Sequence, residues 1–149
     1  MAVPGHVVEL ESELEDLVRS FRTVAVVGMK DETEAGVPAH DIPRMMVARG
    51  IRVIPVNPKL HRALGERAYA SLAEVPDAFD AVQIFRRAEV VGGIADEILA
   101  LPAGRRPRAV WMQTSIRNEG AASRLAAAGM LVVMDRCLGV EAARLRPKA

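Results

Sequence analysis

Positively charged side chains stand where three apolar segments of this chain end, and a parallel sheet would bring those ends together. The residues are Lys30, Lys59, Arg62, Arg86 and Arg87. Lysine and arginine bind phosphate oxygens through charge-assisted hydrogen bonds, and the amino-terminal end of a helix adds a favourable dipole. A single exposed lysine or arginine is ordinarily just solvated. Their shared position, with Arg86 and Arg87 as the strongest signal, predicts a site for a phosphate-rich ligand.

The first of these segments, Thr23–Val27, is an apolar run that leads directly into Gly28. An unbroken apolar run is typical of a strand that is buried on both faces of a parallel sheet. Glycine allows a sharp turn and a close approach of ligand to backbone. In open α/β sheets, ligands bind beyond the carboxyl ends of the strands. We therefore place the site around Gly28.

The residues around Gly28 do not match the dinucleotide fingerprint. That fingerprint needs G-x-G-x-x-G at the first turn and an acidic residue at the end of the second strand. Here the first turn has one glycine, and the second strand ends in Asn57-Pro58-Lys59. The pattern argues against NAD. NADP stays open, because Lys59 could meet a 2′-phosphate.

Groups that could carry catalysis are few. The three histidines, His6, His40 and His61, have no metal-ligand spacing with one another or with the single cysteine. No serine lies in a nucleophile-elbow pattern. The sequence therefore names no catalytic residue and no metal ligand, and His40 is interpreted as a loop histidine.

The only cysteine, Cys137, follows Asp135 and Arg136 at the end of the last apolar run. A single cysteine excludes an intrachain disulfide and a cysteine metal cluster, and it fits a reducing cytoplasm. Two interpretations of Cys137 stay open: a small packing residue, or a reactive thiol beside Arg136 and a helix amino terminus. We expect Asp135 and Arg136 to form an ion pair that orders the last helix.

The composition limits the classes of partner. The formal net charge is +1, which gives no argument for nucleic acid as a partner. No run reaches the roughly 18 apolar residues that a membrane span needs, and the amino terminus lacks a signal-peptide pattern. Half of the residues are apolar, so a substantial core is expected in a domain of this size.

Strand and helix patterns alternate along the chain. Apolar runs predict strands at about 23–28, 51–56, 80–85, 108–113 and 130–134. Apolar spacings of three and four predict helices at about 6–21, 41–49, 72–75, 88–101, 118–128 and 138–145. Asp41 and Asn118 are the expected N-caps, and Pro43 is expected in a first helical turn. This alternation predicts an α/β fold.

In that fold, residues 1–149 form a single Rossmann-like domain. The expected sheet has five parallel strands in the order 3-2-1-4-5, with helices on both faces and right-handed crossovers. The helix within residues 1–22 packs on this domain.

Six short motifs carry a family resemblance. They are Ala25–Gly28, Val53–Pro58, Leu64–Glu66, Phe85–Arg87, Val110–Gln113 and Val133–Cys137. In this order and spacing the chain resembles the small stand-alone CoA-binding proteins, whose domain is similar to the nucleotide-binding part of the succinyl-CoA synthetase alpha subunit. The resemblance covers about residues 17–145.

The resemblance implies coenzyme A as the ligand, with nine residues carried over by position. On the pyrophosphate loop these are Gly28 and Lys30. In the adenosine and 3′-phosphate region they are Val56, Asn57 and Lys59. Beside the pantetheine arm they are Phe85, Arg86 and Arg87 and, further along the pocket, Gln113.

Two features depart from the family pattern. The pattern has a glycine after the fourth strand, where this chain has Gln113-Thr114-Ser115. The loop after Gly28 is long and carries three carboxylates, at Asp31, Glu32 and Glu34. Because carboxylates repel phosphate, we expect them to face solvent or the loop to move.

The sequence thus favours a protein that binds CoA or an acyl-CoA without catalysis of its own. Three alternatives stay open. An NADP-dependent oxidoreductase would need an acid or base that the sequence does not show. A subunit of an acyl-CoA synthetase would need a separate ATP-grasp partner, and a structural dimer module would need no ligand.

Overall fold

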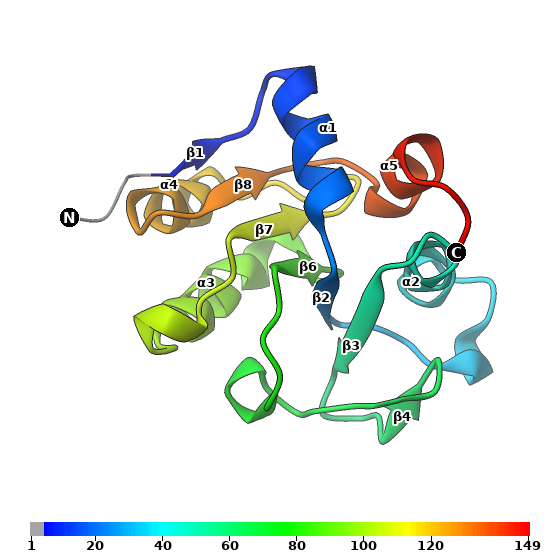
Figure 1. Ribbon diagram of the computed structural model, residues 1–149. Helices are drawn as coiled ribbons and strands as arrows, with labels where there is room; N and C mark the ends of the chain where they lie inside the picture. The colour runs from blue at the N-terminus through cyan, green and yellow to red at the C-terminus, as the bar shows by residue number, and fades with distance from the viewer. Residues whose placement is uncertain (1–4) are drawn as a thin grey trace.

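A computed structural model describes residues 5–149 as an α/β domain built on six parallel strands (Figure 1). The strands are β1 (His6–Val7), β2 (Thr23–Val27), β3 (Arg52–Val56), β6 (Ala81–Ile84), β7 (Ala109–Met112) and β8 (Leu131–Val133). They lie in the order β1-β8-β7-β6-β2-β3. The predicted α/β class and parallel sheet are confirmed, and the first four residues of the predicted 1–22 segment lie outside the described residues.

The predicted strand order 3-2-1-4-5 is wrong. Counted as the five predicted strands, the order is 2-1-3-4-5, because β2 pairs with β3 on one side and with β6 on the other. The physical reason is Pro55, which lacks an N–H and therefore favours an edge strand. The Pro55 carbonyl accepts a hydrogen bond of 3.0 Å from Tyr69 N–H, so a loop covers this edge.

The sixth strand replaces the start of a predicted helix. His6 and Val7 pair with Leu131 and Val132 of β8, and helix α1 begins only at Glu11. The strand covers the outer side of β8, which the five-strand prediction left as an edge. A predicted helix starting at His6 would have left those backbone groups of β8 without partners.

In the described part of the chain, five α-helices cover the two faces of the sheet. They are α1 (Glu11–Ser20), α2 (Pro38–Val47), α3 (Val91–Leu99), α4 (Glu119–Ala127) and α5 (Leu138–Leu145). Helices α3 and α4 lie on one face, and α1, α2 and α5 lie on the other (Figure 1). Among residues 5–149, no helix has the length and apolar character to cross a membrane.

Short elements complete the connections. A hairpin of β4 (Arg62–Ala63) and β5 (Glu66–Arg67) lies between β3 and β6. The 3-10 helices are η1 (Glu32–Glu34), η2 (Leu72–Glu74), η3 (Ala88–Val90) and η4 (Ala103–Arg105). The predicted helix at 72–75 corresponds to η2, whereas the hairpin was not predicted.

Helix α2 begins three residues before the predicted N-cap Asp41. Pro38 occupies its first turn, so Pro43 lies in the helix interior rather than in the first turn. Pro43 has no N–H to donate to the Ala39 carbonyl, four residues back. That carbonyl instead accepts a hydrogen bond of 3.0 Å from Lys30 N–H. The proline thus frees an acceptor that fixes the loop after β2 to α2.

Candidate functional site

The direction of strand order reverses between β2 and β6. From β2 the chain goes to β3 on one side, and later to β6, β7 and β8 on the other. Such a switch point leaves a crevice beyond the carboxyl ends of the two strands, and ligands of open α/β sheets bind there. The residues that follow the two strands are Gly28 and Phe85. Gly28, singled out from the sequence, therefore lies at the switch point.

Gly28 is required by its surroundings. Its φ is +85°, in the left-handed region that favours glycine. A Cβ atom at this position would lie 2.7 Å from the Phe85 carbonyl oxygen and 3.0 Å from the Arg86 Cδ. The close approach brings the end of β2 against the end of β6. Any side chain would push apart the two strand ends that form the crevice.

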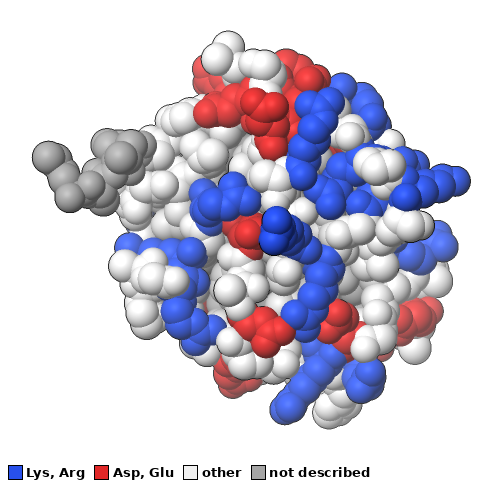
Figure 2. All heavy atoms as spheres, in the orientation of Figure 1, with Lys and Arg blue, Asp and Glu red and all other residues white. Residues whose placement is uncertain are grey.

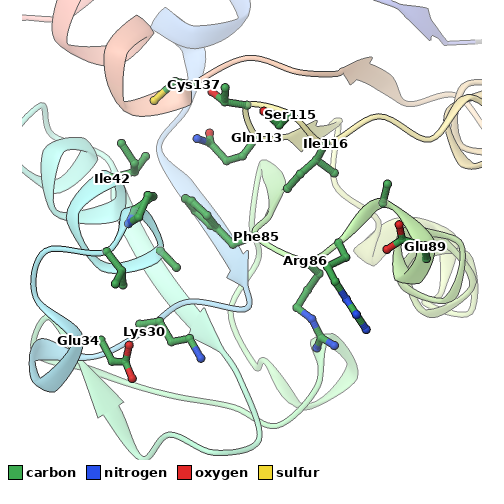
Figure 3. A pocket seen from close by; sticks show the side chains of 16 residues that line it. Lys30, Glu34, Ile42, Phe85, Arg86, Glu89, Gln113, Ser115, Ile116 and Cys137 are labelled. Atoms are coloured by element: carbon green, nitrogen blue, oxygen red, sulfur yellow. The ribbon is translucent and has the colours of Figure 1, made fainter.

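Two adjoining clefts open along this carboxyl edge. The small cleft, of about 580 Å³, lies over the ends of β3, β2 and β6 and includes Val56, Asn57 and Lys59. The large cleft, of about 900 Å³, lies between α2, the β7–α4 loop and the start of α5 (Figure 3). Both clefts are lined by the same four residues, Lys30, Phe85, Arg86 and Arg87. The two clefts are therefore neighbouring parts of one elongated site.

All nine predicted site residues line this elongated site. Those in the small cleft alone are Gly28, Val56, Asn57 and Lys59. Gln113 lies in the large cleft, and the remaining four line both. Arg62, the fifth cation noted in the sequence, lines neither cleft. It lies in the hairpin and donates a hydrogen bond of 2.8 Å to the Gly65 carbonyl.

Asn57 has a structural role within the small cleft. Its side-chain Nδ2 donates to the Met29 carbonyl at 2.9 Å, and its Oδ1 accepts from Lys59 N–H at 2.9 Å. Only 8% of the residue is exposed. Asn57 therefore ties the end of β3 to the loop after β2 and fixes the backbone that carries Lys59.

The cations of the site have no counter-ions of their own. Within residues 5–149, no carboxylate lies within ion-pair distance of Lys30, Lys59, Arg86 or Arg87. Arg86 and Arg87 are exposed, and Figure 3 shows Arg86 and Lys30 on the same side of the large cleft. Unneutralised cations at a concave surface favour an anionic ligand.

Two of the three carboxylates in the loop after β2 are already engaged. Asp31 accepts hydrogen bonds from the Thr33 hydroxyl and the Thr33 N–H, and these lower the pKa of Asp31 below its usual value. Glu32 accepts a bond of 2.6 Å from Leu64 N–H. Glu34 lines the large cleft. Glu34 is exposed to solvent as expected, but it stands at the wall of the cleft.

The far end of the large cleft contains residues that the sequence did not assign to a site. Ile42 of α2 and Ile116 of the β7–α4 loop give it apolar walls, and Cys137 lies at the start of α5. Gln113 is 4% exposed, and its Oε1 accepts hydrogen bonds from Gln83 Nε2 at 3.0 Å and Leu138 N–H at 2.8 Å. A buried glutamine thus fixes the start of α5 beside the cleft.

The β7–α4 loop, in which the family pattern has a glycine, contains a residue with a left-handed backbone conformation. Ser115 has a φ of +69° and Asp135 a φ of +58°. Ser115 N–H donates a hydrogen bond of 2.6 Å to the Asp135 carboxylate. The predicted ion pair between Asp135 and Arg136 is wrong, because Asp135 holds this loop while the Arg136 guanidinium contacts Glu11 and Glu141.

The described residues contain no cluster of three or more metal-ligating side chains, so no metal site is seen in residues 5–149. His40 lies inside α2 rather than in a loop, and it is 4% exposed. Its Nδ1 lies 2.7 Å from the Asp41 carboxylate, and this contact lowers the pKa of Asp41 below its usual value. His40 lines neither cleft.

The fold and the two clefts define an α/β domain with a candidate ligand site at the switch point of a parallel sheet. The model of one protein family, described as a CoA binding domain, matches residues 22–143. The uncharacterized protein YneT of Bacillus subtilis (strain 168) is 34% identical over 130 residues, which cover 87% of this chain and 92% of YneT. The chain belongs to the CoA binding domain family, and the resemblance to CoA-binding proteins is confirmed.

Solved structures agree with the fold. The cell-free ID.343 protein of Thermus thermophilus is 34% identical, with a TM-score of 0.81 over 92% of this chain and 99% of that one. The dinucleotide-forming acetyl-coenzyme A synthetase 1 of Ca. Korarchaeum cryptofilum is 23% identical, with a TM-score of 0.61. The match covers 79% of this chain and 27% of the synthetase. The second likeness concerns the fold alone.

Proposed function

We propose that this protein binds coenzyme A, or an acyl-CoA, along the carboxyl edge of its sheet and carries out no catalytic step of its own. The observation that carries the proposal is the pair of adjoining clefts that share Lys30, Phe85, Arg86 and Arg87. An elongated ligand with a charged nucleotide end and a long, less polar arm has the shape and chemistry of this pair. Membership of the CoA binding domain family supports the same ligand.

The proposed placement follows the order of the strands. Adenosine and the 3′-phosphate lie in the small cleft near Val56 and Lys59, and the pyrophosphate lies near Gly28 and Lys30. The pantetheine arm then passes Phe85 into the large cleft. From β3 to β7 the ligand crosses three strand spacings, about 14 Å at the usual separation of neighbouring strands.

The cations explain why an anionic nucleotide would be preferred. A charge-assisted hydrogen bond contributes about 1.5–3 kcal/mol, and the free cations of the site do not have to give up a carboxylate partner first. We also propose a cytoplasmic setting, which the single cysteine supports.

Titration calorimetry with CoA, dephospho-CoA, NAD and NADP tests the proposal. CoA is expected to bind most tightly, and Lys59→Ala is expected to weaken CoA binding about tenfold through loss of a phosphate contact. Lys148→Ala, near the carboxyl terminus, is the matched control and should not change the affinity. Equal affinity for CoA and dephospho-CoA would remove the 3′-phosphate role from Lys59. Preference for NADP would reject CoA as the ligand.

A further inference from the structure

The only cysteine of the chain lies in the wall of the large cleft. Cys137 is half-buried and is the N-cap residue of α5. It does not line the small cleft, where the nucleotide is proposed to bind. Figure 3 shows its sulfur at the end of the large cleft away from Lys30. A pantetheine arm that enters past Phe85 would bring its terminal thiol toward this end.

Gln113 gives an independent sign that a ligand group belongs at this end of the cleft. The residue is 4% exposed, and both hydrogen bonds of its side chain are made by Oε1. Its Nε2 has no acceptor among residues 5–149, although Gln113 lines the large cleft beside Cys137. Among residues 5–149, the fully buried polar side-chain atoms without a partner are His40 Nε2 and Gln83 Oε1, so Gln113 Nε2 opens to the cleft and a ligand acceptor can reach it. An amide carbonyl, of which pantetheine has two, would satisfy Nε2 there.

The guanidinium next to Cys137 in the sequence is engaged elsewhere. The neighbouring Arg136 guanidinium is turned away, because it binds Glu11 at 2.6 Å and Glu141 at 3.4 Å. Cys137 itself lies at the amino-terminal end of α5 as its N-cap residue. Its backbone is fixed by the bond of 3.1 Å from Glu141 N–H to the Cys137 carbonyl.

We propose that Cys137 is a site of thiol–disulfide exchange with oxidised CoA that is bound in this cleft. The inference rests on the proposed function, since the cleft must first hold the pantetheine arm. The Cys137 thiol gives its proton to solvent, and its sulfur attacks the nearer sulfur of CoA disulfide. The disulfide of the reagent breaks, a Cys137–CoA disulfide forms, and the second CoA leaves as a thiolate. One disulfide replaces another, so no further oxidant is needed.

Intact-mass spectrometry of the reduced, desalted protein tests the exchange. We compare the rate of adduct formation with CoA disulfide against that with hydroxyethyl disulfide, which lacks every group that the cleft would recognise. CoA disulfide should react at least about tenfold faster at equal low concentration, because binding places the two sulfurs together. Cys137→Ser is the control for adducts elsewhere and should gain no mass.

A second variant separates recognition from simple exposure of the thiol. Arg86→Ala should slow the reaction with CoA disulfide about tenfold and leave the reaction with hydroxyethyl disulfide unchanged, since Arg86 is one of the free cations that the anionic CoA ligand would meet where the two clefts join. Desulfo-CoA should slow modification of the native chain by CoA disulfide.

Each remaining outcome decides a different point. If calorimetry shows CoA binding but the two disulfides react equally fast, or neither reacts, the exchange inference is wrong and the proposed function stands. The exchange inference is also wrong if Arg86→Ala weakens CoA binding but does not alter the preference for CoA disulfide. If calorimetry shows no CoA binding at all, both proposals are wrong.

Discussion

Arginine serves two opposite purposes in two regions of this molecule. Between α1 and α5, Arg136 binds Glu11 at 2.6 Å and Arg144 binds Glu15 at 3.3 Å. Figure 2 shows the acidic residues over α1 next to basic residues on the side of α5. At the carboxyl edge of the sheet, Arg86 has no carboxylate partner among residues 5–149. The same side chain is thus neutralised in one region and left available in the other.

The two regions differ in whether carboxylates lie within ion-pair distance of the arginines. Hydrogen bonds from Arg136 lower the pKa of Glu11 below its usual value, and the glutamates raise the pKa of Arg136 and Arg144 in return. The seam between α1 and α5 therefore uses charge to join two helices. The carboxyl edge keeps its positive charge, which makes it suitable for an external anion.

The strongest test of this comparison removes arginines from one region at a time. The double variant Arg86→Ala and Arg87→Ala should weaken CoA binding about 100-fold, since each lost charge-assisted contact with the anionic ligand accounts for about tenfold. Arg144→Ala, which removes a paired arginine, should leave CoA affinity unchanged. Titration calorimetry measures both. A comparable loss for Arg144→Ala would mean that general charge, rather than the local site, attracts the ligand.

Salt should weaken ligand binding by a smaller factor. Raising NaCl from about 0.05 M to about 0.5 M shortens the screening length severalfold, so CoA affinity should fall several times. Dephospho-CoA, with less charge, should be affected less. Calorimetry at four salt concentrations gives the two slopes, and equal slopes would argue against a cation contact to the 3′-phosphate.

Loss of a paired arginine should instead affect stability. Arg136→Ala should lower the free energy of unfolding by about 1 kcal/mol, a value already discounted for solvent screening of a side chain that is 37% exposed. Arg86→Ala should change it by less than about 0.5 kcal/mol. Urea denaturation at neutral pH compares the two. Equal losses would erase the distinction between the regions.

The smallest expected effect is the pH dependence of the seam. Because the folded-state pKa of Glu11 is lowered, its contribution to stability is present above the ordinary glutamate pKa of about 4.3 and is lost as the pH falls below it. The urea midpoints of Glu11→Gln and the native chain should therefore differ at neutral pH and converge near pH 3. A constant difference down to that pH would contradict the role of Glu11 as an ionised partner.

Local patterns in the sequence were sufficient for most elements, and the family resemblance supplied the nine candidate site residues, which remain a prediction. Helix α5 spans Leu138–Leu145 as predicted, and Asn118 caps α4 through its bond to Ala121 N–H. All nine predicted site residues line the clefts, because each follows or ends a strand at one sheet edge. Strand order depends on pairing across the chain, although Pro55 was a local sign that β3 lies at an edge.

Other features could not be predicted because they arise from contacts between distant segments. The strand β1 exists through pairing with β8, and Asp135 turns to Ser115 rather than to the adjacent Arg136. The position of Cys137 in the large cleft requires α5 to pack beside α2. Sequence spacing gives the order of these residues along the chain but not their distances.

Pro43 has a consequence for the motions of the site. A loop amide normally exchanges its proton with solvent quickly, whereas Lys30 N–H is held by the Ala39 carbonyl that the proline leaves free. The Lys30 amide should therefore exchange with deuterium as slowly as the helix that holds it. In Pro43→Ala, the backbone N–H that the substitution introduces would compete for the same carbonyl, and the Lys30 amide should exchange faster. The N–H group that Pro43 lacks thus determines how firmly the loop after β2 is held against α2.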